Sequence, residues 1–84
     1  ALFTMNSPFV VEQAKQLAAR VAGEADDAAR VTALYRHALS RDPESDEREA
    51  ALSFVKSVRH DGQLTNWDKL AQVLLLTNEF VFVD

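Results

Sequence analysis

The sequence predicts an all-α protein: a compact four-helix domain with short apolar extensions at its N- and C-terminal ends. Alanine and leucine are the commonest of its 84 residues, isoleucine is absent, and there are only two glycines and two prolines. Strong helix formers therefore dominate, and helix breakers are few. Apolar residues recur every three or four positions in four separate segments, as they do on one face of a helix. The length allows one small domain and excludes two.

The first two helices are expected on either side of Gly23. Ser7 can cap the first, with Pro8 at the first helical position, where its missing N–H costs nothing; Gly23 is its expected end. Its apolar face comprises Val10, Ala14, Leu17 and Val21. The second opens at Asp26 or Asp27 and closes before positions 42–43, because a residue that precedes proline avoids the α region. Its apolar face comprises Val31, Leu34, Tyr35 and Ala38.

The third helix is expected after Pro43, with Ser45 as its cap, acidic residues in its first turn and an end at residues 61–62. Its apolar face comprises Ala51, Phe54 (or Leu52), Val55 and Val58. The fourth opens on Thr65, which with Asp68 forms a capping box. Its face comprises Trp67, Leu70, Ala71 and Leu74. Across all four helices, we expect a common core of Leu17, Val21, Leu34, Tyr35, Phe54, Val55, Trp67, Leu70 and Leu74.

The two ends of the chain are unusually apolar. Candidate docking residues are Leu2, Phe3, Met5, Phe80, Phe82 and Val83, the last three expected after the fourth helix. They either fold back onto the core, which we favour for Leu2 and Phe80, or dock on other parts of a larger protein, which we favour for Phe82. Since the chain begins without methionine, we expect residues 1–84 to be a single helical domain from a longer protein.

Several classes of function find no support in the composition. There is no cysteine, hence no disulfide, thiolate metal site or cysteine nucleophile in these residues. His37 and His60 lie on different segments without a second ligand at a metal-binding spacing, and we expect no cofactor. The net charge of −4 and the scattered basic residues disfavour nucleic-acid binding. The longest apolar stretch, four residues, is far too short for membrane insertion.

Three stretches carry a family resemblance: residues 2–10, residues 34–43 (Leu-Tyr-Arg-His-Ala-Leu-Ser-Arg-Asp-Pro) and residues 70–80, which end in Asn-Glu-Phe. Together they resemble the C-terminal part of the planctomycete-specific PSD domain of unknown function. The resemblance implies a large exported or periplasmic planctomycete protein, often associated with a cytochrome-c-like domain, and implies no activity. The family usually has glycine where this chain has Ser40, so a left-handed helix cap there would be strained.

Two function hypotheses follow. The first is a non-catalytic structural or interaction module that packs against the upstream domains of its parent protein, with weak self-association when isolated. The alternative is the C-terminal piece of an enzyme, redox-linked or carbohydrate-degrading, whose active site lies upstream, since no catalytic constellation is present in this fragment. An exposed apolar patch would favour the module, and a cleft with converging Asp, Glu or His side chains would favour the enzyme.

A structural clamp is also predicted between two charged residues of the resemblance. Arg41 follows the second helix and Glu79 lies near the chain end, and neither position needs a charge for local structure. We therefore expect Arg41 to pair with Glu79 or to hold the last carbonyls of a neighbouring helix. The alternative is two unrelated solvated charges, because surface pairs contribute only about 0–1 kcal/mol.

Overall fold

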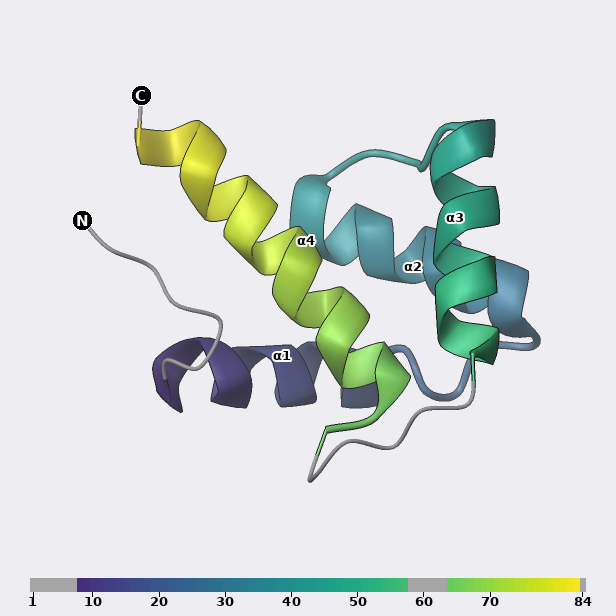
Figure 1. The fold of residues 1–84 in the computed structure, drawn as a ribbon, viewed down its shortest axis with the longest axis horizontal. Coiled ribbons are helices and arrows are strands. Elements are labelled where there is room, and N and C mark those ends of the chain that lie inside the picture. The colour runs from purple at the N-terminus through teal and green to yellow at the C-terminus, as the bar shows by residue number, and fades with distance from the viewer. Residues whose placement is uncertain (1–7, 58–63, 84) are drawn as a thin grey trace.

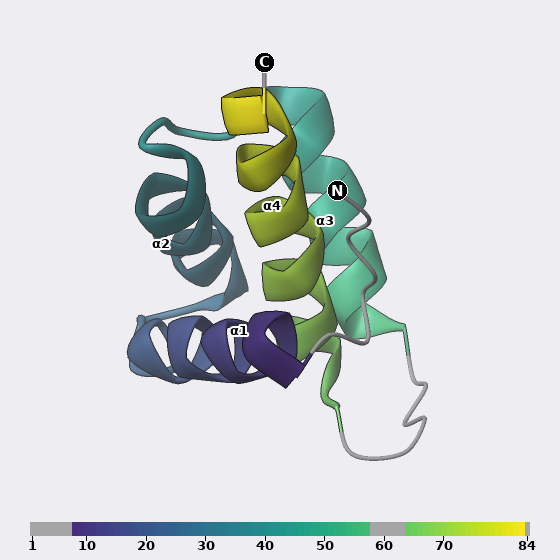
Figure 2. The same ribbon diagram turned by 90° about the vertical axis from the view of Figure 1, so that its left-hand side faces the viewer.

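The computed structural model describes residues 8–57 and 64–83, apart from the side chains of residues 78–83. These residues form four helices: α1 (Pro8–Arg20), α2 (Asp27–Leu39), α3 (Ser45–Lys56) and α4 (Asn66–Val83). The longest, α4, contacts each of the other three. Figures 1 and 2 show α1 lying across the lower end of the domain, with the first turns of α4 beside it. The prediction of an all-α domain of four helices is therefore confirmed.

Local sequence accounts for where α1 and α2 begin. Pro8 occupies the first position of α1 as predicted, whereas its predicted cap, Ser7, lies outside the described residues. α1 ends at Arg20, three residues before the expected stop at Gly23, whose φ is not left-handed. Asp26 caps α2, its carboxylate accepting a hydrogen bond from the Ala29 N–H at 2.8 Å. That bond satisfies one of the free N–H groups of the first turn.

The start of α3 differs from the prediction. Glu44, not Ser45, is the N-cap of α3, and its backbone N–H donates to the Glu47 carboxylate at 2.9 Å. The reach of Glu47 back to the cap explains the shift, because a side chain three residues into the helix satisfies the cap N–H. α3 ends at Lys56, earlier than the predicted end, and Val58 and His60 lie outside the described residues.

α4 starts as predicted and runs further than predicted. The Thr65 N–H donates to the Asp68 carboxylate, and the Asp68 N–H donates to the Thr65 hydroxyl, both at 3.1 Å. The capping box is thus confirmed. The helix continues to Val83, so the expectation that Phe80, Phe82 and Val83 follow the fourth helix is wrong. No proline or glycine interrupts residues 66–83, and nothing local stops the helix.

The core lies where the other three helices meet α4. Leu34, Val21 and Val31 are fully buried, and most of the predicted core is confirmed. The buried cluster comprises Ala14, Val21, Val31, Leu34, Tyr35, Ala38, Ala51, Leu70, Ala71 and Leu74. Leu17, Val55 and Trp67 are partly buried against it. Phe54 is the exception, 39% exposed, while its alternative, Leu52, packs against the core.

Candidate functional site

The turn between α2 and α3 carries the charged residues of the family resemblance. α2 ends at Leu39, and Ser40 adopts a left-handed conformation with φ 59° and ψ 31°. The Ser40 N–H donates to the Arg36 carbonyl at 3.0 Å, as expected of a left-handed helix cap. The strained cap anticipated from the replacement of glycine is therefore present. It redirects the chain so that Pro43 is buried and α3 packs against α2.

An ion pair closes this turn on its outer side. The Arg36 guanidinium donates to both carboxylate oxygens of Asp42, with its Nη2 at 3.3 Å from Oδ2. The hydrogen bond from Arg36 holds the pKa of Asp42 below its ordinary value and raises that of Arg36. Both side chains are well exposed, so the pair fixes the geometry of the turn more than it stabilises the domain.

A second ion pair joins the turn to the first turn of α3. Arg41 binds Glu47 through two parallel hydrogen bonds of 2.8 and 2.9 Å, and also donates to the Asp42 carbonyl at 3.1 Å. The Arg41 guanidinium lies 5.6 Å from the centre of the Tyr35 ring. This two-pronged geometry suits guanidinium and carboxylate. The hydrogen bonds from Arg41 and from the Glu44 N–H lower the pKa of Glu47 to about 2.

Among the described side chains, the carboxylate that pairs with Arg41 is that of Glu47. The Arg41 guanidinium also binds a carbonyl of its own turn. The side chain of Glu79 lies outside the described residues, so its pairing with Arg41 stays a prediction. Sequence reasoning missed Glu47 because it was assigned to helix N-terminal charge alone. The signal that could have found it is the capping-box spacing from Glu44.

The ion pair of Arg41 and Glu47 predicts a particular acid sensitivity. The folded pKa of Glu47, about 2, lies below its ordinary 4.5, so unfolding takes up a proton at acid pH. The stabilisation is full above about pH 4.5 and is lost as the pH falls toward 2. We expect Glu47→Gln to destabilise the domain at pH 6 and to converge with the wild type near pH 2. Urea unfolding across this range measures the difference.

Glu79→Gln tests the predicted clamp in the same experiment. If Arg41 also holds Glu79, this variant should show its own pH-dependent loss, and a double-mutant cycle of Arg41→Ala with Glu79→Ala should give a coupling energy. A cycle without coupling would reject the predicted clamp. A Glu47→Gln variant whose stability parallels that of the wild type at every pH would contradict the role given to Glu47.

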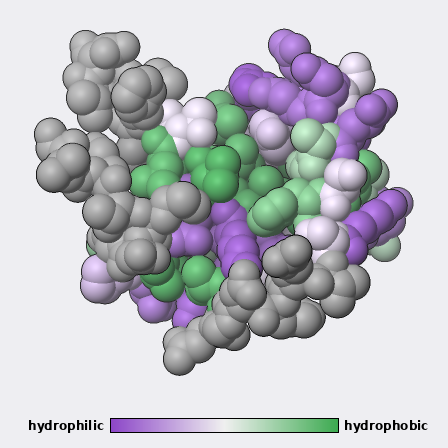
Figure 3. Space-filling model, in the orientation of Figure 1, coloured by the Kyte–Doolittle hydropathy of each residue, from purple (hydrophilic) through white to green (hydrophobic). Residues whose placement is uncertain are grey.

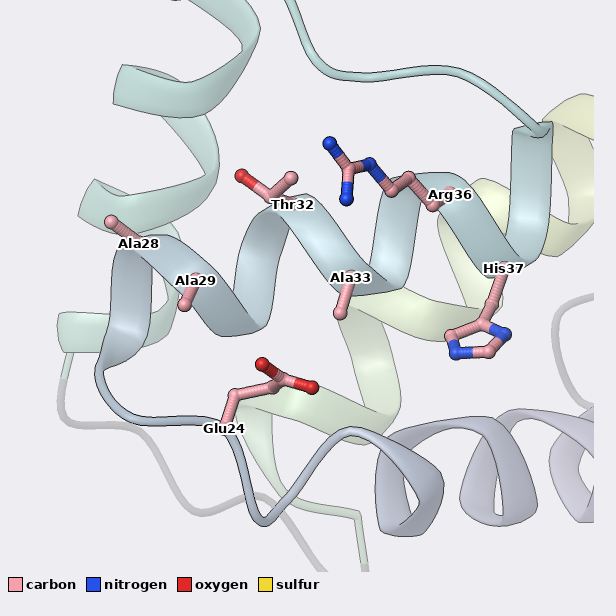
Figure 4. Close-up of a pocket in the computed structure, with 7 residues that line it drawn as sticks. All are labelled: Glu24, Ala28, Ala29, Thr32, Ala33, Arg36 and His37. Carbon is pink, nitrogen blue, oxygen red and sulfur yellow. The ribbon is translucent and has the colours of Figure 1, made fainter.

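One open depression lies along the outer face of α2 (Figure 4). Small side chains of α2 line most of it, with the Glu24 carboxylate reaching up from the α1–α2 connection. His37 lies on the same side near the end of the helix, whereas Arg36 points to the other side, toward its partner Asp42. The acid and base groups of this depression do not converge on one point, so it gives the enzyme hypothesis no specific support.

A second concavity, the α3–α4 groove, is apolar and has a volume of about 290 Å³. Its floor is formed by the buried Ala51, Leu70 and Leu74, its rims by the exposed Ala50, Phe54 and Val73, and one end by Tyr35 and Glu47. Phe54 is 39% exposed and Val73 46% exposed. Figure 3 shows hydrophobic side chains gathered in the middle of the face seen in Figure 1, with hydrophilic ones to the right. This is the kind of exposed apolar patch that favours an interaction module.

None of the docking residues predicted from the sequence is among the described residues that line this groove. Leu2, Phe3 and Met5 lie outside the described residues. The backbone of Phe80, Phe82 and Val83 is part of α4, but their side chains lie outside the described part. In Figure 1 the first turn of α1 and the last turn of α4 lie on the same side of the domain, at its lower and upper ends. A common docking surface at the two ends therefore stays a prediction.

Comparison with known families decides the classification. Residues 1–55 match the model of PSD1, described as a protein of unknown function (DUF1553). The chain belongs to this family. Within the PSD1 match lie the turn between α2 and α3 and the α3 side of the groove, whereas α4 lies beyond it. Searches of curated proteins and of solved structures found no match.

Two further observations concern the described part of this PSD1 domain. No helix within it has both the length and the apolar character needed to cross a membrane. Among its described side chains, no group of three or more histidine or acidic residues is placed to hold a metal ion. The residues shared with the family resemblance therefore build a turn, and the groove beside that turn is the candidate functional site.

Proposed function

We propose that this PSD1 domain is a non-catalytic helical interaction module that packs against the upstream part of its own protein. The observation that carries the proposal is the α3–α4 groove, where Phe54 and Val73 remain exposed beside an apolar floor. A partner that covered these side chains would gain about 25 cal/mol for each Å² of apolar surface removed from water. A volume of about 290 Å³ lies at the lower limit of small-molecule sites, which favours inserted side chains over a cofactor.

The resemblance to the planctomycete PSD domain supplies the setting of this proposal. It supports an exported or periplasmic protein in which the domain is the C-terminal piece, and it supports docking without membrane insertion or nucleic-acid binding. The apolar residues at the two chain ends, Phe82 in particular, would extend the docking surface. Freed from its parent, a domain with such surfaces is expected to self-associate weakly at high concentration.

The test is association between this domain and the upstream part of its parent, expressed separately and mixed in a sedimentation velocity experiment. We expect a complex, and we expect Val73→Glu to weaken it at least about tenfold, because a buried carboxylate without a partner is costly. Phe9→Ser is the matched control, since Phe9 is 68% exposed and lies on α1. Wild-type domain and upstream part that sediment independently would contradict the proposal.

The contribution of the two chain ends to association is measured by sedimentation velocity on the isolated domain. We expect the wild type to show weak self-association at high concentration and Phe82→Ser to reduce it. A strictly monomeric wild type would remove the support for docking through the ends, while the result for Val73→Glu would still decide the role of the groove.

A further inference from the structure

We infer that the α3–α4 groove binds an amphipathic helix whose apolar face carries a lysine or arginine at the Tyr35 end of the groove. The inference rests on the proposed docking function and specifies the chemistry of the partner. It follows from two features of the described residues: the groove is apolar along most of its length, and the end near the start of α3 is polar and acidic.

The shape of the groove suits side chains that project from a partner helix. Two helices, α3 and α4, form its walls, and the small, buried side chain of Ala51 keeps the floor low on the α3 side. Phe54 and Val73 stand at the rims, exposed to solvent. Grooves of this kind accept the i, i+3, i+4 and i+7 side chains of an amphipathic helix. The apolar face of such a partner would cover both rims at once.

The polar end of the groove is where a cationic side chain would fit. Tyr35 is 7% exposed and lines the groove beside the Glu47 carboxylate. A tyrosine hydroxyl oxygen accepts hydrogen bonds, so Tyr35 offers a partner an acceptor at this end of the groove. Lysine and arginine have an apolar stem and a charged head. The stem would lie in the apolar groove, and the head would lie near the oxygens of Tyr35 and Glu47 at its end.

The charge around this end is negative. Residues 35–50 contain three arginines and five acidic residues. Arg36 and Arg41 are each bound to a carboxylate, which leaves the charges of Glu44, Asp46 and Glu49 against that of Arg48. Burial is the main cause that raises the pKa of Tyr35; the nearby Glu47 and Asp46 add to the rise and Arg41 opposes it. Exposed rim charges of this kind select partners by sign.

The same charge argues against a second copy of this chain as the occupant. Two copies that met groove to groove would bring their acidic α3 ends toward each other, in a chain whose net charge is already −4. Like charges across an interface oppose association. A partner with basic residues flanking its apolar face removes that repulsion.

The test uses three synthetic helical peptides of about 15 residues, close to the shortest length that holds a helix in water. They share leucines at i, i+3, i+4 and i+7 and differ at one terminal-turn position, which is lysine, glutamine or glutamate. Binding to the intact 84-residue domain is followed by NMR titration of its backbone amides. We expect the lysine peptide to bind roughly threefold to tenfold more tightly than the glutamine peptide, and the glutamate peptide to bind least. The preference should shrink as salt is raised to about 1 M.

Variants locate the source of that preference. Asp46→Asn should reduce the ratio between the lysine and glutamine peptides while the glutamine peptide binds as before, and Tyr35→Phe should weaken both peptides, because the lysine and the glutamine side chain can both donate to the hydroxyl. Asp27→Asn is the matched control, because Asp27 is also an exposed acid in the first turn of a helix but lies on α2. Circular dichroism confirms that each variant is folded.

The outcomes separate the two proposals. If the three peptides bind with equal affinity and Val73→Glu weakens the binding of all three, the charge inference is overturned and docking in the groove remains supported. A preference for lysine that Asp27→Asn reduces as much as Asp46→Asn would also overturn it, since the preference would then reflect net charge. If the backbone amides of the groove respond to none of the peptides, the inference is overturned. The sedimentation experiment with the upstream part of the parent protein would then decide the proposed docking function.

Discussion

Leu34→Ala is expected to destabilise the domain by about 2–5 kcal/mol. Leu34 is fully buried in α2, within the cluster that joins all four helices. Truncation removes apolar contacts and leaves a cavity that a small core cannot refill. Because small domains have only about 5–15 kcal/mol of total stability, much of the population should unfold at physiological temperature. Thermal unfolding followed by circular dichroism measures the change, and we expect the midpoint to fall by roughly 10 °C or more.

Val73→Ala is the matched control for this experiment. Val73 is also an aliphatic residue in a helix, but it is 46% exposed on the rim of the groove. We expect it to change the stability by no more than about 0.5 kcal/mol. The assignment of the core would be contradicted if Leu34→Ala and Val73→Ala had the same melting temperature as the wild type.

Ser40→Gly is expected to stabilise the domain, by about 1 kcal/mol. Ser40 holds a left-handed conformation at the end of α2, which costs a residue with a Cβ roughly 1–2 kcal/mol. Glycine removes that cost, and its greater freedom in the unfolded chain cancels part of the gain. In a domain of this size the melting temperature should rise by about 4–8 °C.

Ser57→Gly tests whether that gain comes from the left-handed backbone. Ser57 also follows the end of a helix, α3, but its φ is −67°, a conformation that any residue adopts. Its hydroxyl donates to the Phe54 carbonyl at 2.6 Å. Glycine at this position relieves no strain and removes a hydrogen bond, so we expect a loss of stability. Stabilisation by both substitutions, or by neither, would contradict the explanation given for Ser40.

The α3–α4 groove could not be predicted from the sequence, and Phe54 shows why. On the period of α3 alone, Phe54 and Leu52 were alternatives for the apolar face. A helix of 12 residues has several directions in which an apolar side chain can point, and only its neighbours decide which one is buried. Here α2 and α4 cover Ala51 and Leu52, and Phe54 is left on the rim.

At the turn between α2 and α3, the turn itself could be predicted from the sequence, but the ion pair that it carries could not. Arg41 was singled out because its charge has no local purpose, and it does make a polar contact. Its partner among the described residues is Glu47, six residues along the chain, because the left-handed Ser40 and the buried Pro43 fold the chain back and bring the two together. The turn was predictable, since a residue before proline avoids the helix. The ion pair depends on the direction in which α3 continues after the turn, because that direction places Glu47 near Arg41.

The amino-acid pattern alone predicts the fold class, the number of helices, the caps at Asp26 and Thr65 and most of the buried core. These features depend on residues within a turn or two of one another, whose propensities and spacing are visible in the chain. Only the tertiary structure decided that Phe54 and Val73 are exposed beside a groove and that Glu47 holds Arg41. Those depend on the angles at which helices cross, and such angles come from packing between residues far apart in the sequence.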